Sequence, residues 1–298
     1  FKQKTAYEIG VRLVGSEMCI RDRINKSVMK HTRLITICLL LLISSLSNAQ
    51  QPSFVSDSLD SYIERGMKQW QIPGLAIAIV KNGKVVLSKG YGVRELGKDD
   101  KVDENTLFII ASNSKLFTGT AIAKLDHEKK LSLNDKVTQY IPWFRLYDST
   151  SGKLANIRDM LCHRLGTKTF QGDFTFWDSN LPKDSIIWKM RYLKPTGEFR
   201  QDYGYCNSAF LVAGEILTKV TGMSWENYVQ ENMLTPLGMR NTYMNTTGLA
   251  NRVNVAAPHN NLFNSITKIP FDNVDNLGPA TSMAVSYTHL TLPTNREV

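Results

Sequence analysis

Hydrophobic and polar positions follow helical periodicity in some parts of the chain and strand-like runs in others. Residues 55–70 place their apolar side chains on one helical face. Two apolar runs then flank Asn82-Gly83 within residues 75–93. Because Asn and Gly adopt positive φ at low cost, this pattern predicts a β-hairpin closed by a tight turn.

The rest of the chain indicates a mostly helical region. Helices are expected over residues 113–126, 157–163, 208–221 and 224–234. Residues 164–200 have little periodicity, and residues 245–283 are rich in Asn, Pro and Gly and look loop-like. A two-stranded hairpin is marginal by itself. We therefore predict an α+β fold whose antiparallel sheet needs further strands.

The chain has 298 residues, of which 42% are hydrophobic, and a formal net charge of +9. More than half of that charge lies before residue 50. No basic run with interleaved aromatic residues occurs, so nucleic acid is not an expected partner. His127, His163 and His259 lack the spacing of metal ligands. We expect neither a metal ion nor another cofactor.

The two ends of the sequence are related at the level of the DNA that can encode them. The segments "MCIRD" at 18–22 and "VSYTH" at 285–289 can be encoded by one DNA element read from opposite strands. That element resembles the transposon end used in sequencing libraries. We therefore expect residues 1–28 to be adapter-like or read-through sequence and 284–298 to be an adapter-like tail. On this interpretation the natural chain continues beyond Met283, and residues 284–298 do not pack into the core.

Residues 29–49 have the pattern of a signal peptide. Basic residues follow Met29, an apolar core comes next, and Ser47-Asn48-Ala49 forms a small-x-small cleavage site. The apolar run is short for a membrane span, so no stable span is expected after cleavage, although a retained anchor is the alternative. The sequence thus predicts an exported protein, periplasmic or secreted. It does not address oligomeric state.

Two cysteines, Cys162 and Cys206, lie in the predicted domain. In an exported chain they can form a disulfide, or they can be two buried thiols. A nucleophilic pair of Cys206 with His163 has no local support.

The motif Ser-x-x-Lys offers a candidate nucleophile. It occurs at Ser27–Lys30, Ser112–Lys115 and Ser265–Lys268. Only the second copy opens a plausible amphipathic helix, where residues i and i+3 share a face. The N-terminus of that helix supplies N–H groups and a positive dipole that favour a developing oxyanion. The alternative is that Ser112 only caps the helix and Lys115 is solvated.

A second motif, Tyr205-Cys206-Asn207, stands at the start of another predicted helix. A tyrosine beside a lysine can act as general base toward a serine hydroxyl. An asparagine two residues later can bond the lysine and a substrate amide. The same spacing recurs at Tyr243–Asn245, so the motif is weak by itself. The alternative is that Tyr205 is only a packed aromatic residue near the start of a helix.

Together these motifs resemble the serine β-lactamase and penicillin-binding protein superfamily, with class C β-lactamase-like hydrolases as the nearest branch. Segments such as "IPGLAIAIVKNGKVVLSKGYGV" and "PTGEFRQDYGYCNSAFLVAGEIL" support the likeness. The resemblance implies a β-lactamase/transpeptidase-like domain over residues 50–283, with helices flanking an antiparallel sheet that is incomplete without the missing C-terminus. It implies that Ser112 is acylated, that Lys115 assists, and that Tyr205 is the base. It also implies that Asn207 binds substrate and that the Ser112 N–H is half of an oxyanion hole.

The same resemblance leaves the substrate open. A β-lactam, an ester and a D-amino-acid peptide bond share acyl-enzyme chemistry, so the expected partner is a small-molecule or peptidoglycan-like substrate. The family's third motif, Lys/His-x-Gly, is absent between Tyr205 and Met283. The chain as given is therefore expected to be inactive by itself. His163 is expected to be structural. The rival function is a non-catalytic penicillin sensor or peptidoglycan-peptide binder of the same fold.

Overall fold

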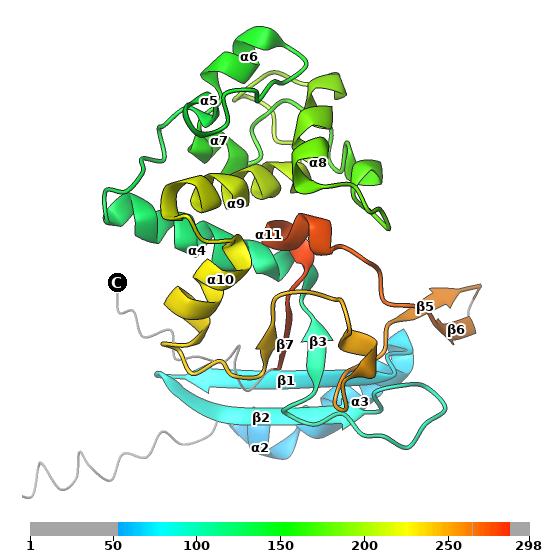
Figure 1. Ribbon diagram of the computed structural model, residues 1–298. Coiled ribbons are helices and arrows are strands. Elements are labelled where there is room, and N and C mark those ends of the chain that lie inside the picture. The colour runs from blue at the N-terminus through cyan, green and yellow to red at the C-terminus, as the bar shows by residue number, and fades with distance from the viewer. Residues whose placement is uncertain (1–52, 264, 287–298) are drawn as a thin grey trace, which may run out of the picture. The chain divides into compact units, whose positions relative to one another are not determined.

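The computed structural model describes residues 53–263 and 265–286 (Figure 1). The predicted leader at 29–49, residues 1–28 and residues 287–298 lie outside these ranges. Among the described residues, no helix is both long enough and apolar enough to cross a membrane.

Among the described residues, a long run of helices lies between strands that come earlier and later in the chain. The helices are α2 (Ser53–Asp57), α3 (Leu59–Trp70), α4 (Ser114–His127), α5 (Val137–Tyr140), α6 (Ser149–Leu154), α7 (Ile157–Leu161), α8 (Lys183–Lys189), α9 (Asn207–Thr221), α10 (Trp225–Val229) and α11 (Gly278–Thr281). The strands are β1 (Gly74–Lys81), β2 (Lys84–Gly92), β3 (Leu107–Ile109), β4 (Thr242–Tyr243), β5 (His259–Leu262), β6 (Ser265–Lys268) and β7 (Ala284–Ser286). Within the described ranges the strands pair as β1-β2, β3-β7-β4 and β5-β6.

The predicted hairpin is present as β1 and β2, which pair antiparallel. Asn82 and Gly83 have φ values of 51° and 69°, the positive values that a tight hairpin turn requires. The predicted helix before it is split into α2 and α3. Leu59 and Ile63 of α3 pack with Tyr91 of β2 in a small apolar cluster.

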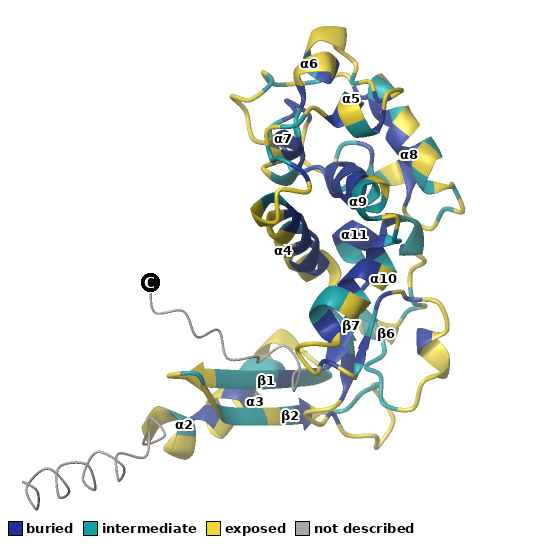
Figure 2. Ribbon diagram, turned by 60° about the vertical axis from the view of Figure 1, so that its left-hand side comes forward, coloured by how far each residue is buried: buried dark blue, intermediate teal, exposed yellow. Residues whose placement is uncertain are grey.

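The main core lies in the helical region (Figure 2). Helix α9 is buried on nearly all sides, because α4, α5, α7, α8, α10 and α11 pack around it. Its sequence accordingly has few charged residues, as expected for a central helix. Helix α4 buries Phe117, Ala121, Ile122 and Leu125, the face that its periodicity predicts. In Figure 1, β3 and β7 lie between this helical region and the β1-β2 hairpin.

The expectation that residues 284–298 stay out of the core is wrong for residues 284–286. They form β7, which pairs with β3 on one side and β4 on the other. Ala284 belongs to one apolar cluster and Val285 to another. The domain therefore extends to Ser286 among the described residues. The physical reason is that both faces and both edges of this strand find partners. Residues 287–298 lie outside the described residues.

Two segments expected to be irregular contain regular elements. Residues 245–283 include the β5-β6 hairpin and the short helix α11, and residues 164–200 include α8. These elements are four to seven residues long. Such lengths are too short to produce a periodic signal. Ser265–Lys268 forms β6, so this copy of Ser-x-x-Lys does not open a helix.

Candidate active site

Ser112 lies in a 3-10 turn, Ala111–Asn113, between β3 and α4. Ala111 has a φ of 44°, a left-handed conformation that costs about 1–2 kcal/mol for a residue with a Cβ. This strained turn presents an exposed serine immediately before a helix. The serine does not cap α4, because the N-cap position is Asn113 and no side chain makes a capping hydrogen bond. The helix-cap alternative is therefore wrong.

Lys115 points from the first turn of α4 into the site. Its Nζ donates hydrogen bonds to Ser112 Oγ at 3.1 Å, to Asn207 Oδ1 at 2.8 Å and to the Ala280 carbonyl at 2.9 Å. An ammonium group has three donors, and the site supplies three acceptors. Only 9% of the Lys115 residue surface is exposed, so the alternative of a solvated lysine is wrong.

Burial lowers the pKa of Lys115 to about 8, although the nearby Asp173 carboxylate and, to a smaller extent, the Cys206 side chain act in the opposite direction. We expect side-chain NMR to show one lysine amine titrating near pH 8 and to lose that signal in Lys115→Met. The unfolded chain keeps this proton up to the ordinary pKa of 10.5. The folded protein releases it earlier, so this group's contribution to stability increases with pH between about 8 and 10.5. An amine titrating only near 10.5 would contradict this prediction.

Tyr205 brings its hydroxyl to the same serine. Tyr205 OH lies 2.7 Å from Ser112 Oγ, in a hydrogen bond that either hydroxyl can donate. The Tyr205 carbonyl accepts a hydrogen bond from Phe170 N–H at 2.8 Å. Gly204 packs against the Thr167 carbonyl so closely that a Cβ there would lie 1.6 Å from its oxygen. Only glycine fits at this close approach. Tyr203, by contrast, is 66% exposed and packs edge-on against His163.

His163 supports the tyrosine rather than contacting the serine. Its ring stacks on the Tyr205 ring with 4.4 Å between centroids. Its Nδ1 accepts the Cys206 backbone N–H at 3.1 Å. Burial, together with the charge of Lys115, lowers the pKa of His163 to about 4. The imidazole is therefore neutral at pH 7, as expected for a structural histidine.

A buried ion pair holds the loops that carry His163 and Tyr205. Asp159 is fully buried and accepts hydrogen bonds from Arg164 at 2.8 Å and from Arg200, also at 2.8 Å. Burial acts to raise the pKa of Asp159, but bonds from Arg200, the Asn156 backbone and Arg164 outweigh it and the pKa is lowered. Arg164 directly follows His163, and Arg200 lies in the segment that precedes Tyr205. Asp159 belongs to α7, so its carboxylate holds both segments against this helix.

Asn207, the first residue of α9, joins the lysine to a residue that the sequence did not single out. Its Oδ1 accepts from Lys115, and its Nδ2 donates to Asp173 Oδ2 at 3.0 Å. Asp173 lies in a 3-10 turn, Asp173–Thr175. Its Oδ1 is buried and has no hydrogen-bond partner among the described residues. The structure thus brings together Ser112, Lys115, Tyr205 and Asn207, and adds Asp173.

Two contributors to this geometry were missed by sequence reasoning. Asp173 falls in an aperiodic stretch and belongs to no motif. Ala280 contributes a backbone carbonyl, which a side-chain motif does not encode. The segment "PATSM", which contains Ala280 and resembles a family Pro-Ala-Gly segment, was the available signal.

The two cysteines of the domain are free thiols, one exposed and one buried. They form neither a disulfide nor the alternative of two buried thiols. Burial raises the pKa of the Cys206 thiol to about 11, so a reactive thiolate there is disfavoured. Within the described residues, no group of three or more His, Cys, Asp or Glu side chains is arranged to hold a metal ion.

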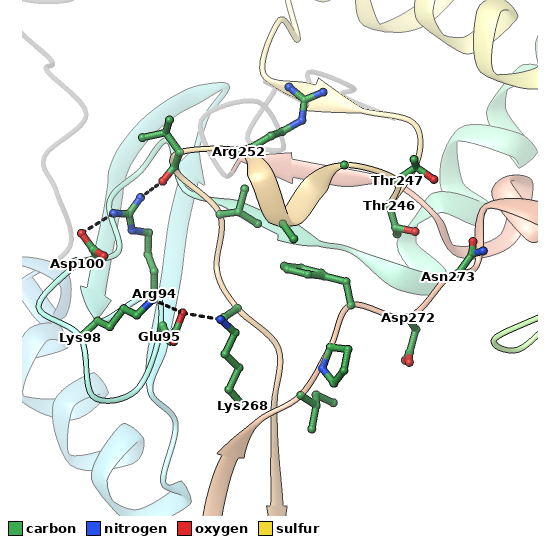
Figure 3. A pocket seen from close by; sticks show the side chains of 18 residues that line it. Arg94, Glu95, Lys98, Asp100, Thr246, Thr247, Arg252, Lys268, Asp272 and Asn273 are labelled. Atoms are coloured by element: carbon green, nitrogen blue, oxygen red, sulfur yellow. Dashed lines mark hydrogen bonds and ion pairs between the residues drawn. The ribbon is translucent and has the colours of Figure 1, made fainter.

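A cavity of about 650 Å³ has a lining that includes none of the four predicted site residues (Figure 3). Several of the lining side chains are charged, and some of them form ion pairs with one another. Arg94 forms an ion pair with Asp100 at 2.9 Å, and Lys268 forms one with Glu95 at 2.8 Å. The charges of these four lining residues are therefore paired with one another.

Comparison with known proteins identifies the family. A family model described as Beta-lactamase matches residues 59–274. This match covers more than half of the chain, so the protein belongs to the Beta-lactamase family. Membership in the serine β-lactamase and penicillin-binding protein superfamily, and the predicted fold class, are confirmed. The class C branch stays a prediction.

Among curated proteins, the chain is similar to Protein flp of Staphylococcus aureus (strain MW2), with 34% identity over 197 residues. That match covers 63% of this chain and 38% of the relative. It is also similar to a teichoic acid D-alanine hydrolase of Staphylococcus aureus (strain MRSA252), with 29% identity over 182 residues. That match covers 61% of this chain and 42% of the relative. The chain therefore spans less than half the length of these relatives.

Among solved structures, the fold is similar to the octameric penicillin-binding protein homologue from Pyrococcus abyssi. The TM-score is 0.68 at 27% sequence identity, and the match covers 78% of this chain and 54% of that one.

Proposed function

We propose that the protein is a serine hydrolase that works through an acyl-enzyme on Ser112. The observation that carries this proposal is that an exposed serine Oγ lies between Lys115 Nζ and Tyr205 OH. A serine hydroxyl is a weak nucleophile at neutral pH and needs an adjacent group to accept its proton. Tyr205 is within reach for that role, and Lys115 places a positive charge beside both oxygens.

In this proposal Tyr205 reacts as the phenolate beside the Lys115 ammonium: Ser112 Oγ attacks the substrate carbonyl carbon, and the Tyr205 oxygen takes the serine proton to become a neutral hydroxyl. The tetrahedral intermediate then collapses: the bond from the carbonyl carbon to the leaving group breaks, the Tyr205 hydroxyl gives its proton to that group, and the acyl ester on Ser112 remains. Water attacks the ester in the second half-reaction and releases the acid. Lys115 acts as an ammonium opposite the developing negative charge. Asn207 bonds the lysine and retains an N–H for a substrate carbonyl.

The substrate is proposed to be an ester or amide of a D-amino acid, with D-alanyl esters first. The support is the likeness to a relative named as a teichoic acid D-alanine hydrolase. A β-lactam is the next substrate class, because it forms the same acyl-enzyme. The leader pattern at 29–49 supports export, so we propose that the protein acts outside the cytoplasm.

The test uses the full-length natural protein with D-alanyl esters, a D-Ala-D-Ala peptide, p-nitrophenyl acetate and nitrocefin. Turnover is followed by product formation, and the covalent intermediate by intact-mass spectrometry with mapping of the modified residue. We expect a mass increase on Ser112 and multiple turnovers with D-alanyl ester. An adduct on Ser112 without turnover of any substrate would favour the non-catalytic binder. No adduct with any of the four would reject the acyl-enzyme.

A further inference from the structure

Asp173 extends the hydrogen-bond chain of the site by one step beyond the motif residues. The chain runs from Asp173 Oδ2 to Asn207 Nδ2 at 3.0 Å, and from Asn207 Oδ1 to Lys115 Nζ at 2.8 Å. It ends at Ser112 Oγ, 3.1 Å from the lysine nitrogen. The Asp173 carboxylate is thus the fourth side chain of a series, and it is connected to the nucleophile through the Asn207 amide and the Lys115 amine.

These contacts determine the orientation of the Asn207 amide. In the opposite orientation, Nδ2 would face the Lys115 ammonium, and two donors would meet. Oδ1 would then face the Asp173 carboxylate, and two acceptors would meet. Only the observed orientation satisfies both neighbours. With one N–H bonded to Asp173, the amide has a second N–H left for a substrate carbonyl.

The charge of Asp173 also acts on the lysine. Burial raises the pKa of Asp173, whereas the Asn207 bond and the charge of Lys115 lower it, and the net shift is upward. In return, the Asp173 charge raises the pKa of Lys115 against the lowering effect of burial. The other groups that face Lys115 are Cys206, His163 and the Tyr205 ring, whose centroid lies 4.8 Å from Nζ. Cys206 and His163 favour the neutral thiol and imidazole, so Asp173 is the anionic neighbour.

We infer that Asp173 is a positioning residue of the acylation site, which fixes the Asn207 amide and keeps Lys115 in its ammonium form. This inference rests on the proposed function, because it assigns the ammonium form of Lys115 to acylation. It predicts that the acylation rate falls as pH rises through the Lys115 pKa. The position of this fall, which is the alkaline limb of the pH–rate profile, should depend on the charge at residue 173.

The test measures Ser112 acylation between pH 6 and 10 in wild type, Asp173→Asn and Asp173→Ala. The asparagine variant retains an acceptor for Asn207 but removes the charge, so its alkaline limb should move to lower pH. The alanine variant also frees the amide, and acylation should fall by roughly 10–100-fold, the usual effect of losing a hydrogen bond to a charged group. Asp173→Glu should restore the limb toward the wild-type position.

Asp178→Asn is the matched control, because it removes the same charge from an exposed position on the same loop. Its profile should coincide with that of wild type. Melting temperatures show which variants fold. If Asp173→Ala does not fold, Asp173→Asn still tests the inference, because it preserves the side-chain volume. An alkaline limb unchanged in Asp173→Asn overturns the inference while leaving the acyl-enzyme standing. No acylation of wild-type Ser112 overturns the proposed function itself.

Discussion

We expect Ser112→Ala to abolish covalent labelling by an acylating probe in the full-length protein and to leave the fold intact. The substitution removes the oxygen that both Lys115 and Tyr205 contact. Without it no acyl bond can form, however well substrate binds. Ser112 is exposed, so the substitution opens no core cavity; the loss of one acceptor of Lys115 costs about 1–3 kcal/mol, which is less than the usual stability of about 5–15 kcal/mol. Labelling followed by intact mass, together with a thermal melt, measures both effects.

Ser265→Ala is the matched control for that experiment. It removes the serine of another Ser-x-x-Lys sequence, which lies exposed on β6. Labelling of this variant should equal that of wild type. Turnover that persists in Ser112→Ala at the wild-type rate would reject Ser112 as the nucleophile and move the chemistry elsewhere.

Tyr205→Phe should slow acylation by roughly 10²–10⁴-fold, the usual contribution of general acid–base catalysis. The phenyl ring keeps the stacking on His163 and loses only the hydroxyl that lies 2.7 Å from Ser112 Oγ. The effect should therefore appear in the rate of acylation and not in the melting temperature. Stopped-flow measurement with a chromogenic acyl donor separates this rate from later hydrolysis.

Tyr203→Phe is the control for the tyrosine experiment, because Tyr203 stands two residues away and is largely exposed. Its acylation rate should be close to that of wild type. If Tyr203→Phe slows acylation while Tyr205→Phe does not, the proton acceptor has been assigned to the wrong tyrosine.

Local sequence chemistry accounts for several elements that the structure contains. Asn82-Gly83 determines a hairpin because few other pairs adopt two positive φ angles at low cost. The apolar spacing of residues 113–126 predicts the buried face of α4. Ser112 and Lys115 meet because they stand three residues apart across the 3-10 turn that leads into α4. These features depend on residues close together in the chain, so a sequence pattern can show them.

Features that depend on distant segments could not be predicted in the same way. β5, β6 and β7 are three or four residues long, and β7 exists because β3 and β4 bond both its edges. Asp173 belongs to no motif, and its place in the site depends on the contact between its turn and Asn207. Ala280 contributes a carbonyl that any residue at that position would carry.

The sequence by itself determined the hairpin, the helix that begins after Ser112, and the two motifs that carry the candidate chemistry. Only the tertiary structure decided that the Tyr205 hydroxyl comes within 2.7 Å of Ser112 Oγ, and that Lys115 is buried among three acceptors. The reason is physical. Periodicity and turn propensity act over a few neighbouring residues, whereas a hydrogen bond across 93 positions depends on how α4 and the segment before α9 pack together. That packing also makes Asp173 part of the site.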